Sequence, residues 1–391
     1  MISQRLRQLR LARGFSLDAL VAEIGGAVTK QALSKYEQGT ARPSPVVLNK
    51  LADALGVRTA YLWSEPGIRV EFVAYRKGSA LTKSEQARVE ALVAEALEAR
   101  VHLQDLLGHT EDVILPVHAL KIHRTEDAEE AATELRREWQ LGLDPIANMT
   151  DMLEHRFVHV LQIEAGDRFD GISAVAYDGE YCARAAAVVS RKGVPGGRQR
   201  LNLGHELGHL VLDVPEDVDQ ESAAFRFGAA FLAPAAVIRS EIGQRRAFIQ
   251  PEELLLLKQR FGISLQALLF RLKDLGIITD SYYRQWCIDI NRLGWRKEEP
   301  MELSAEQPQW LRQNVLRALA EELISRDDAE AMLGERVAVD LPLPAIERRA
   351  FMKLPLEERR RLLAEQADKL ADYYAQDSEW LDLEAGDFVE Y

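Results

Sequence analysis

Two histidines and a glutamate interrupt an apolar segment of the chain, LNLGHELGHLVLD (residues 201–213). His205, Glu206 and His209 have the spacing H-E-x-x-H. On a helix, residues four apart lie on one face, about 6 Å apart along the axis, so two imidazole nitrogens can bind one zinc ion. A glutamate beside them can accept a proton from water on the metal. The spacing therefore predicts a zinc centre with Glu206 as general base, provided that a third ligand exists.

Glu221 is the candidate for the third protein ligand. It lies near the start of a predicted helix, residues 217–232, and Pro215 breaks the chain between this helix and His209. Zinc enzymes commonly take a carboxylate from a helix that follows H-E-x-x-H and keep the fourth position for water. Alternatively, Glu221 is a surface acid that the helix dipole favours near a helix N-terminus.

Short strands precede the predicted zinc-binding helix. Residues 157–164 alternate as a strand, and residues 167–190 contain two more strands around the Asp178–Gly179 turn. Tyr177 and Tyr181 flank this turn, and either could donate a hydrogen bond to the oxyanion of a tetrahedral intermediate. A small sheet beside a metal-binding helix predicts a zincin-like domain, in a chain of the α+β class that is mainly α.

The N-terminal segment is basic and has the pattern of a small helical bundle. Residues 1–65 carry nine Lys and Arg against five acidic residues, a charge of +4, whereas the whole chain has a net charge of -13. Ser16 and Thr29 are predicted N-caps, and Gly39 ends the third helix. Two short helices joined by a glycine turn predict a helix-turn-helix, whose third helix can reach bases and phosphates in a major groove. The side chains on the reading face of this helix are Lys30, Gln31, Ser34 and Lys35.

Composition places the chain among globular proteins of more than one domain. Its 391 residues are 47% hydrophobic, and its apolar runs fall far short of the ~20 residues that span a membrane. The N-terminus lacks the continuous apolar core of a signal peptide. The short apolar runs therefore predict no membrane association. Cys182 and Cys287 lie far apart and show no metal-ligand spacing, so a disulfide framework is not expected and a reducing cytoplasm is.

The chain divides into five predicted parts. They are a helix-turn-helix domain (1–65), connecting helices (66–149), a zinc peptidase domain (150–300), a helical extension (301–340) and an acidic C-terminal segment (341–391). The last fifteen residues hold six acids and no Lys or Arg, interleaved with Trp380, Phe388 and Tyr391. They are either a solvated tail or a recognition segment whose aromatic anchors bind a partner protein.

The run QALSKYEQGTARPS…LNKLADALGV resembles the Xre-type helix-turn-helix family over roughly residues 3–63. The resemblance implies that the third helix enters the major groove of a double-stranded operator and that Arg42 contacts phosphate. A homodimer is expected, because one such small domain rarely binds tightly alone. Alternatively, the bundle serves only for dimerisation or protein contact.

The run GRQRLNLGHELGHLVL, followed by ExxAxxFGAAFLAP, resembles the ImmA/IrrE metallopeptidase family over about residues 150–235. The resemblance implies that the three ligand candidates bind Zn²⁺ and that Glu206 is the general base of an endopeptidase. Two positions depart from the family pattern. Phe225 stands where a histidine is frequent and Gly228 where an alanine is common, which could alter the fit of the substrate but leaves zinc binding intact.

The C-terminal run KLPLEERRRLLAEQADKLADYY…EW…GDFVEY resembles antitoxins of PIN-domain ribonuclease toxins, which implies such a toxin as a partner. Together, these features predict a DNA-binding transcriptional regulator with a zinc-dependent endopeptidase domain. It would cleave a regulator protein, itself or a partner, in a stress, phage or toxin–antitoxin response. The alternative is a non-proteolytic repressor or antitoxin that binds operator DNA and a toxin. Glu206 favours the peptidase, because a purely structural zinc site needs no base.

Overall fold

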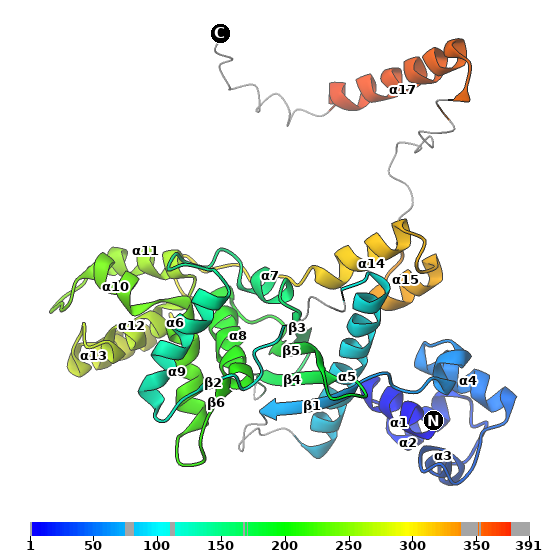
Figure 1. Ribbon diagram of the computed structural model, residues 1–391, viewed down its shortest axis with the longest axis horizontal. Coiled ribbons are helices and arrows are strands. Elements are labelled where there is room, and N and C mark those ends of the chain that lie inside the picture. The colour runs from blue at the N-terminus through cyan, green and yellow to red at the C-terminus, as the bar shows by residue number, and fades with distance from the viewer. Residues whose placement is uncertain are drawn as a thin grey trace. The chain divides into compact units, whose positions relative to one another are not determined.

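The computed structural model is mainly helical, with a four-stranded sheet and a two-stranded sheet among its described residues, which confirms the predicted α+β class (Figure 1). It describes residues 2–74, 82–109, 114–166, 169, 171–337, 351 and 353–376. The chain divides into two compact units, residues 1–333 and 334–391. The second unit contains helix α17 (Leu356–Gln376).

The N-terminal part of the first unit forms the predicted helical bundle. Its elements are α1 (Ile2–Ala12), α2 (Leu17–Glu23), α3 (Lys30–Glu37), α4 (Pro45–Leu55) and the 3₁₀ helix η1 (Thr59–Trp63). The hydroxyl oxygens of Ser16 and Thr29 accept hydrogen bonds from backbone N–H groups at the starts of α2 and α3, as predicted. Leucines from α1, α2, α3 and α4, such as Leu6, Leu33 and Leu51, are fully buried in one core, so the apolar spacing of the sequence accounts for the packing.

A four-stranded sheet follows, with the strand order β1-β4-β5-β3. Its strands are β1 (Arg69–Ala74), β3 (Val158–Ile163), β4 (Gly171–Tyr177) and β5 (Ala183–Arg191). Strands β1 and β5 pair antiparallel with β4, and β3 pairs parallel with β5. The last three were predicted, whereas β1 lies in the stretch assigned to connecting helices. Its partner β4 lies far along the sequence, and the short run RVEFVA has no pattern that distinguishes a strand from a helix.

Helices cover the two faces of this sheet. Helix α5 (Lys83–Leu106), the predicted long helix, packs Val93 and Leu97 against Ala174 and Ala187 on one face. Side chains of β4 alternate between the faces, so Gly171 and the residues two and four positions further on point to the other face, where helix α8 (Gly196–Val211) lies. The stretch before residue 150 therefore contributes both a strand and a covering helix to the sheet.

Helix α8 lies in the larger core. The elements around it are β2 (Leu120–Lys121), η2 (Thr125–Asp127), α6 (Ala128–Glu138), α7 (Met149–Glu154), β6 (Leu212–Asp213), α9 (Gln220–Leu232), α10 (Ala235–Ile242), α11 (Pro251–Phe261), α12 (Leu265–Asp274) and α13 (Asp280–Arg292). Helices α14 (Trp310–Ala320) and α15 (Arg326–Leu333) lie outside this core, and α14 contacts α5. Gly262 separates α11 from α12 in a left-handed conformation, as the predicted break requires.

One carboxylate ties the segment before α14 to the N-terminal turn of α8. The carboxylate of Glu306 accepts hydrogen bonds from the backbone N–H groups of Met149 and Thr150. It also forms an ion pair with Arg200, at 2.6 Å. The side-chain amide of Gln199 donates a hydrogen bond to the backbone carbonyl of Glu306 and accepts one from its backbone N–H group. The arginine-rich lead-in to H-E-x-x-H thus has a structural role, because it fixes the start of the helix that carries the histidines.

Among the described helices, none alone is long and apolar enough to cross a membrane, although α9 and α10, bent by 57° at their junction, pass such a test as a pair.

Candidate functional site

The predicted metal centre lies where α8 and α9 cross closely. A Cβ at Gly228 would lie 2.7 Å from the backbone N of His205, and a Cβ at Gly208 would lie 3.0 Å from the Cα of Ala224. Because these residues are small, the backbones of the two helices lie closer together than they could with larger side chains at the crossing. The close approach brings Glu221, in the first turn of α9, beside the imidazoles of α8.

Three candidate ligands converge at this crossing. Nε2 of His205 lies 3.1 Å from Nε2 of His209. The carboxylate oxygens of Glu221 lie 3.5 Å from the former and 3.6 Å from the latter nitrogen. In tetrahedral zinc sites, metal–nitrogen and metal–oxygen distances of about 2.1 Å place neighbouring ligand atoms about 3.4 Å apart. The triangle therefore has the size of one face of a zinc tetrahedron, and these residues fit the metal.

Phe225, one of the two departures from the family pattern, packs against a proposed ligand. Its ring centroid lies 4.1 Å from that of His205, with the planes tilted by 46°. The Nδ1 of His205 is buried and has no hydrogen-bond partner among the described residues. Such ligands usually donate this N–H to an acceptor that fixes the ring. Here the contact with Phe225 limits the rotation of the imidazole instead.

Glu206 is buried between α8 and the sheet, with 6% of the residue exposed. The hydroxyl of Ser173 on β4 lies 2.7 Å from Oε2 of Glu206 and 2.9 Å from its backbone oxygen, so it can donate to either. A Cβ at Gly171 would collide with the same carboxylate. Strand β4 thus holds the candidate base on both sides, which the sequence did not indicate because the contact joins residues 33 positions apart.

Neither tyrosine proposed as an oxyanion donor lies beside Glu206. Tyr181 is 68% exposed, and its hydroxyl accepts a hydrogen bond from Arg69. Tyr177 lies on the same face of β4 as Ser173, but four residues further along, or about 13 Å at 3.3 Å per residue. Burial, with a smaller contribution from the charge of Glu71, raises the pKa of Tyr177. The role of either tyrosine as an oxyanion donor therefore stays a prediction.

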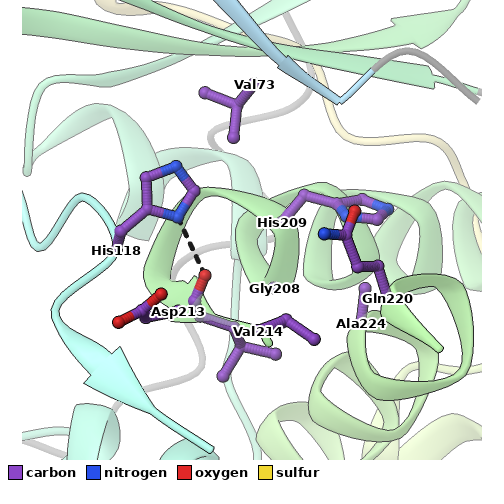
Figure 2. Close-up of a pocket in the computed structure, with 9 residues that line it drawn as sticks. Val73, His118, Gly208, His209, Asp213, Val214, Gln220 and Ala224 are labelled. Carbon is purple, nitrogen blue, oxygen red and sulfur yellow. Dashed lines mark hydrogen bonds between the residues drawn. The ribbon is translucent and has the colours of Figure 1, made fainter. Parts of the chain in front are cut away.

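A cavity of about 350 Å³ adjoins the metal centre. Figure 2 shows that His118 and His209 lie on opposite sides of this cavity, with Val73 above them. Sequence reasoning missed His118, because an isolated histidine in the segment LPVHALK has no motif around it. Its position follows from β2 pairing with β6, directly after α8.

The proposed DNA-reading side chains lie together on α3. Lys30, Gln31 and Lys35 are exposed, and so is Arg42 in the following loop. Ser34 is half-buried, and its hydroxyl oxygen accepts a hydrogen bond from Gln38. Lys30 also forms an exposed ion pair with Asp18, at 2.5 Å.

The tail prediction cannot be placed in the same way. Trp380, Phe388 and Tyr391 lie outside the described residues.

Comparison with known families agrees with the two resemblances to an Xre-type helix-turn-helix and an ImmA/IrrE peptidase. Residues 6–62 match a helix-turn-helix family model, and residues 187–273 match the peptidase family model described as the IrrE N-terminal-like domain. A curated relative, the SPbeta prophage-derived uncharacterized HTH-type transcriptional regulator YonR of Bacillus subtilis (strain 168), is 37% identical over 62 residues. That match covers 16% of this chain and 56% of the relative. The chain thus joins a helix-turn-helix DNA-binding domain of the Xre-like type to an IrrE-like peptidase domain.

Proposed function

We propose that the chain is a DNA-binding regulator whose peptidase domain is a zinc-dependent endopeptidase. The observation that carries the proposal is the ligand triangle of His205, His209 and Glu221, with Glu206 adjacent on the same helix. A structural zinc site would use a fourth protein ligand and no base, whereas a catalytic site has three ligands and an open position. Among the described residues, these three are the only His, Cys, Asp or Glu cluster that could hold a metal.

The residues of the chain divide the chemistry between them. A bound zinc ion would lower the pKa of water and polarise the peptide carbonyl. Glu206 accepts the proton of the attacking water and returns it to the leaving amine. Ser173 and Gly171 keep the carboxylate of Glu206 in place, because the hydroxyl binds one oxygen and the missing side chain leaves room for the other.

The substrate we favour is a regulator protein, either this chain or a separate partner. Within the connecting region, residues 69–74 are paired in the sheet and residues 83–106 are packed on it as α5. A peptide bond must be extended and accessible to enter a peptidase site. Of the described residues between the helix-turn-helix domain and α5, residues 64–68 best meet this condition, since they belong to no helix or strand.

The biological setting follows from the resemblances. The prophage origin of the curated relative supports a phage or stress response. The tail's likeness to antitoxins makes a PIN-domain toxin a further candidate partner. As a homodimer, the chain would bind a double-stranded operator through α3 of each copy.

Metal analysis of the purified full chain tests the metal centre. We expect about one zinc per chain in the wild type and a marked loss in the variant Glu221→Ala. Glu216→Ala is the control, since this acid lies in the loop before α9 and outside the ligand triangle. Full zinc occupancy in Glu221→Ala would remove Glu221 from the ligand set.

DNA binding is tested separately with the full chain. Gln31→Ala should change sequence preference, whereas Arg42→Ala should weaken binding to all sequences alike and lower its salt dependence. Electrophoretic mobility shifts across salt concentrations measure both effects. A full chain that shows no affinity for its own promoter at low salt would contradict the DNA-binding part of the proposal.

A further inference from the structure

The cavity beside the metal centre is built from four separate parts of the chain. Residues from β1, from the loop before β2, from the end of α8 with β6, and from the start of α9 line it. Val73, Leu212, Val214 and Ala224 supply apolar walls. Since His209 lines the same cavity, the space opens directly beside a proposed zinc ligand (Figure 2).

His118 forms the far side of this cavity in a constrained conformation. Its backbone N–H donates to the carbonyl of Leu210, and its Nδ1 lies 2.9 Å from the carbonyl oxygen of Leu212. Its φ of 48° is in the left-handed region, which non-glycine residues rarely adopt and which often marks functional sites.

These contacts determine the chemistry of the imidazole. A carbonyl oxygen only accepts hydrogen bonds, so Nδ1 carries the proton and donates it. In the neutral ring, Nε2 is therefore a hydrogen-bond acceptor. The ring can accept an N–H group from an extended peptide that lies between it and the metal.

We propose that this cavity is the subsite for an apolar side chain of the substrate and that Nε2 of His118 accepts a hydrogen bond from the adjacent substrate backbone. The proposal rests on the proposed peptidase function and names the substrate class of that site. The size of the cavity admits a leucine or phenylalanine side chain. Asp213 also lines it, so an acidic side chain meets a like charge and binds poorly.

Peptide hydroxamates test the subsite without requiring turnover, because the hydroxamate group binds zinc directly. We would titrate N-acetyl-leucine, N-acetyl-glycine and N-acetyl-aspartate hydroxamates into the zinc-loaded full chain by calorimetry. Burial of the leucine side chain should make the leucine compound bind roughly 10- to 100-fold more tightly than the glycine compound. The aspartate compound should bind no better than the glycine compound.

Two variants assign the effect to the cavity. Val214→Trp fills the space and should abolish the advantage of the leucine compound over the glycine compound. Val46→Trp, on the exposed surface of α4, is the matched control and should behave as the wild type. His118→Asn tolerates the left-handed backbone and keeps a donor for Leu212, but lacks Nε2. It should weaken all three compounds by roughly 3- to 10-fold.

The outcomes separate this inference from the proposed function. Equal affinities for the leucine and glycine compounds in a chain that holds zinc would overturn the subsite and leave the peptidase proposal standing. Unchanged affinities in His118→Asn would remove the histidine from substrate binding. A wild-type chain that holds no zinc would overturn the proposed function itself, and the subsite with it.

Discussion

At the scale of single residues, the site depends on neighbours that hold the reacting groups rather than on the groups alone. Glu206 projects from α8 into the sheet and meets Ser173 and Gly171 there. His205 has the ring of Phe225 against it. In the proposed mechanism, a base and a ligand that are fixed before substrate arrives lose little freedom during the reaction, so these contacts should affect the cleavage rate and the zinc affinity.

Removing the hydroxyl of Ser173 tests the support of the base. In Ser173→Ala, Glu206 loses a short hydrogen bond, and we expect cleavage to slow by roughly tenfold, because a bond to a charged group contributes about 1.5–3 kcal/mol. Zinc content should stay at the wild-type level. Ser190→Ala is the control: this serine is equally buried on β5, and its hydroxyl has no partner among the described residues. Equal cleavage rates in both variants would contradict the role of Ser173.

Replacing the aromatic ring over His205 tests the support of the metal ligand. In Phe225→Ala, the imidazole gains rotational freedom, and we expect zinc affinity to fall by roughly tenfold, the lower end of the range for residues that orient ligands. Competition with a chromogenic chelator measures the affinity. Phe248→Ala removes a more exposed ring, at 56% against 39%, that packs on Tyr282, and should leave the affinity unchanged. Equal zinc affinities in Phe225→Ala and Phe248→Ala would contradict the role of Phe225 in orienting His205.

At the scale of elements, the crossing of α8 and α9 sets the geometry of the proposed metal centre. Gly204 and Gly208 on α8 meet Gly228 and Ala224 on α9, and the gaps between the backbones leave no room for a further Cβ without a shift. The glycine that departs from the family pattern is therefore explained by packing. In this chain, an alanine at 228 would press on the backbone N of His205.

Gly228→Ala should consequently push the helices apart. We expect a loss of about 1–3 kcal/mol in the free energy of unfolding, as for other overpacked cores, together with weaker zinc binding. Chemical denaturation and zinc titration measure the two effects. Gly67→Ala is the matched control, since a Cβ there meets no atom within 4 Å. If Gly228→Ala has the same free energy of unfolding as the wild type, the two helices can move apart without loss of stability, which contradicts the prediction.

The elements also show which parts of the site the sequence could predict. The spacing of His205 and His209, and the caps at Ser16 and Thr29, are local features, and local geometry fixes them. By contrast, strand β1, Ser173 and His118 lie at the site because their segments pack against segments distant in sequence, as β1 pairs with β4. No periodicity within a few residues contains such a contact.

At the scale of the whole molecule, the first unit connects the helix-turn-helix domain to the peptidase domain through ion pairs. Arg5 on α1 is fully buried, and its Nη2 donates to Glu98 on α5 at 2.6 Å. Arg13 pairs with Glu95 on the same helix, at 2.7 Å. Burial by itself lowers the pKa of Arg5. The hydrogen bond to Glu98, together with the electrostatic effects of Tyr61, Glu98 and Glu95, outweighs burial and raises that pKa, so the guanidinium stays charged.

This docking bears on how cleavage could act. Arg58 at the end of the bundle also pairs with Asp328 on α15, at 2.7 Å. A cut at residues 64–68 would break the chain but not these contacts, so the helix-turn-helix domain would remain attached until they dissociate. Helix α3, the proposed recognition helix, takes part in none of these ion pairs, so the side chains proposed to contact DNA stay accessible.

Glu98→Ala tests the docking. It leaves the buried guanidinium of Arg5 without its main partner, and we expect the domain contact to weaken by about 3–5 kcal/mol, as for other broken buried pairs. Limited proteolysis should then cut residues 64–68 faster than in the wild type. Asp18→Ala, which removes only the exposed pair with Lys30, should change little. Equal proteolysis of both variants would argue against the docking.

The central claim is that this regulator cleaves protein with Glu206 as its base. The most direct measurement is mass spectrometry of the chain and its co-purifying proteins, from cells under DNA damage or phage stress, for the wild type and Glu206→Gln. Zinc content should be equal in both, because Glu206 is not a ligand. We predict fragments of this chain or of a partner regulator in the wild type that are missing in Glu206→Gln. Identical fragment patterns would contradict the proteolytic mechanism and leave a DNA-binding repressor or antitoxin.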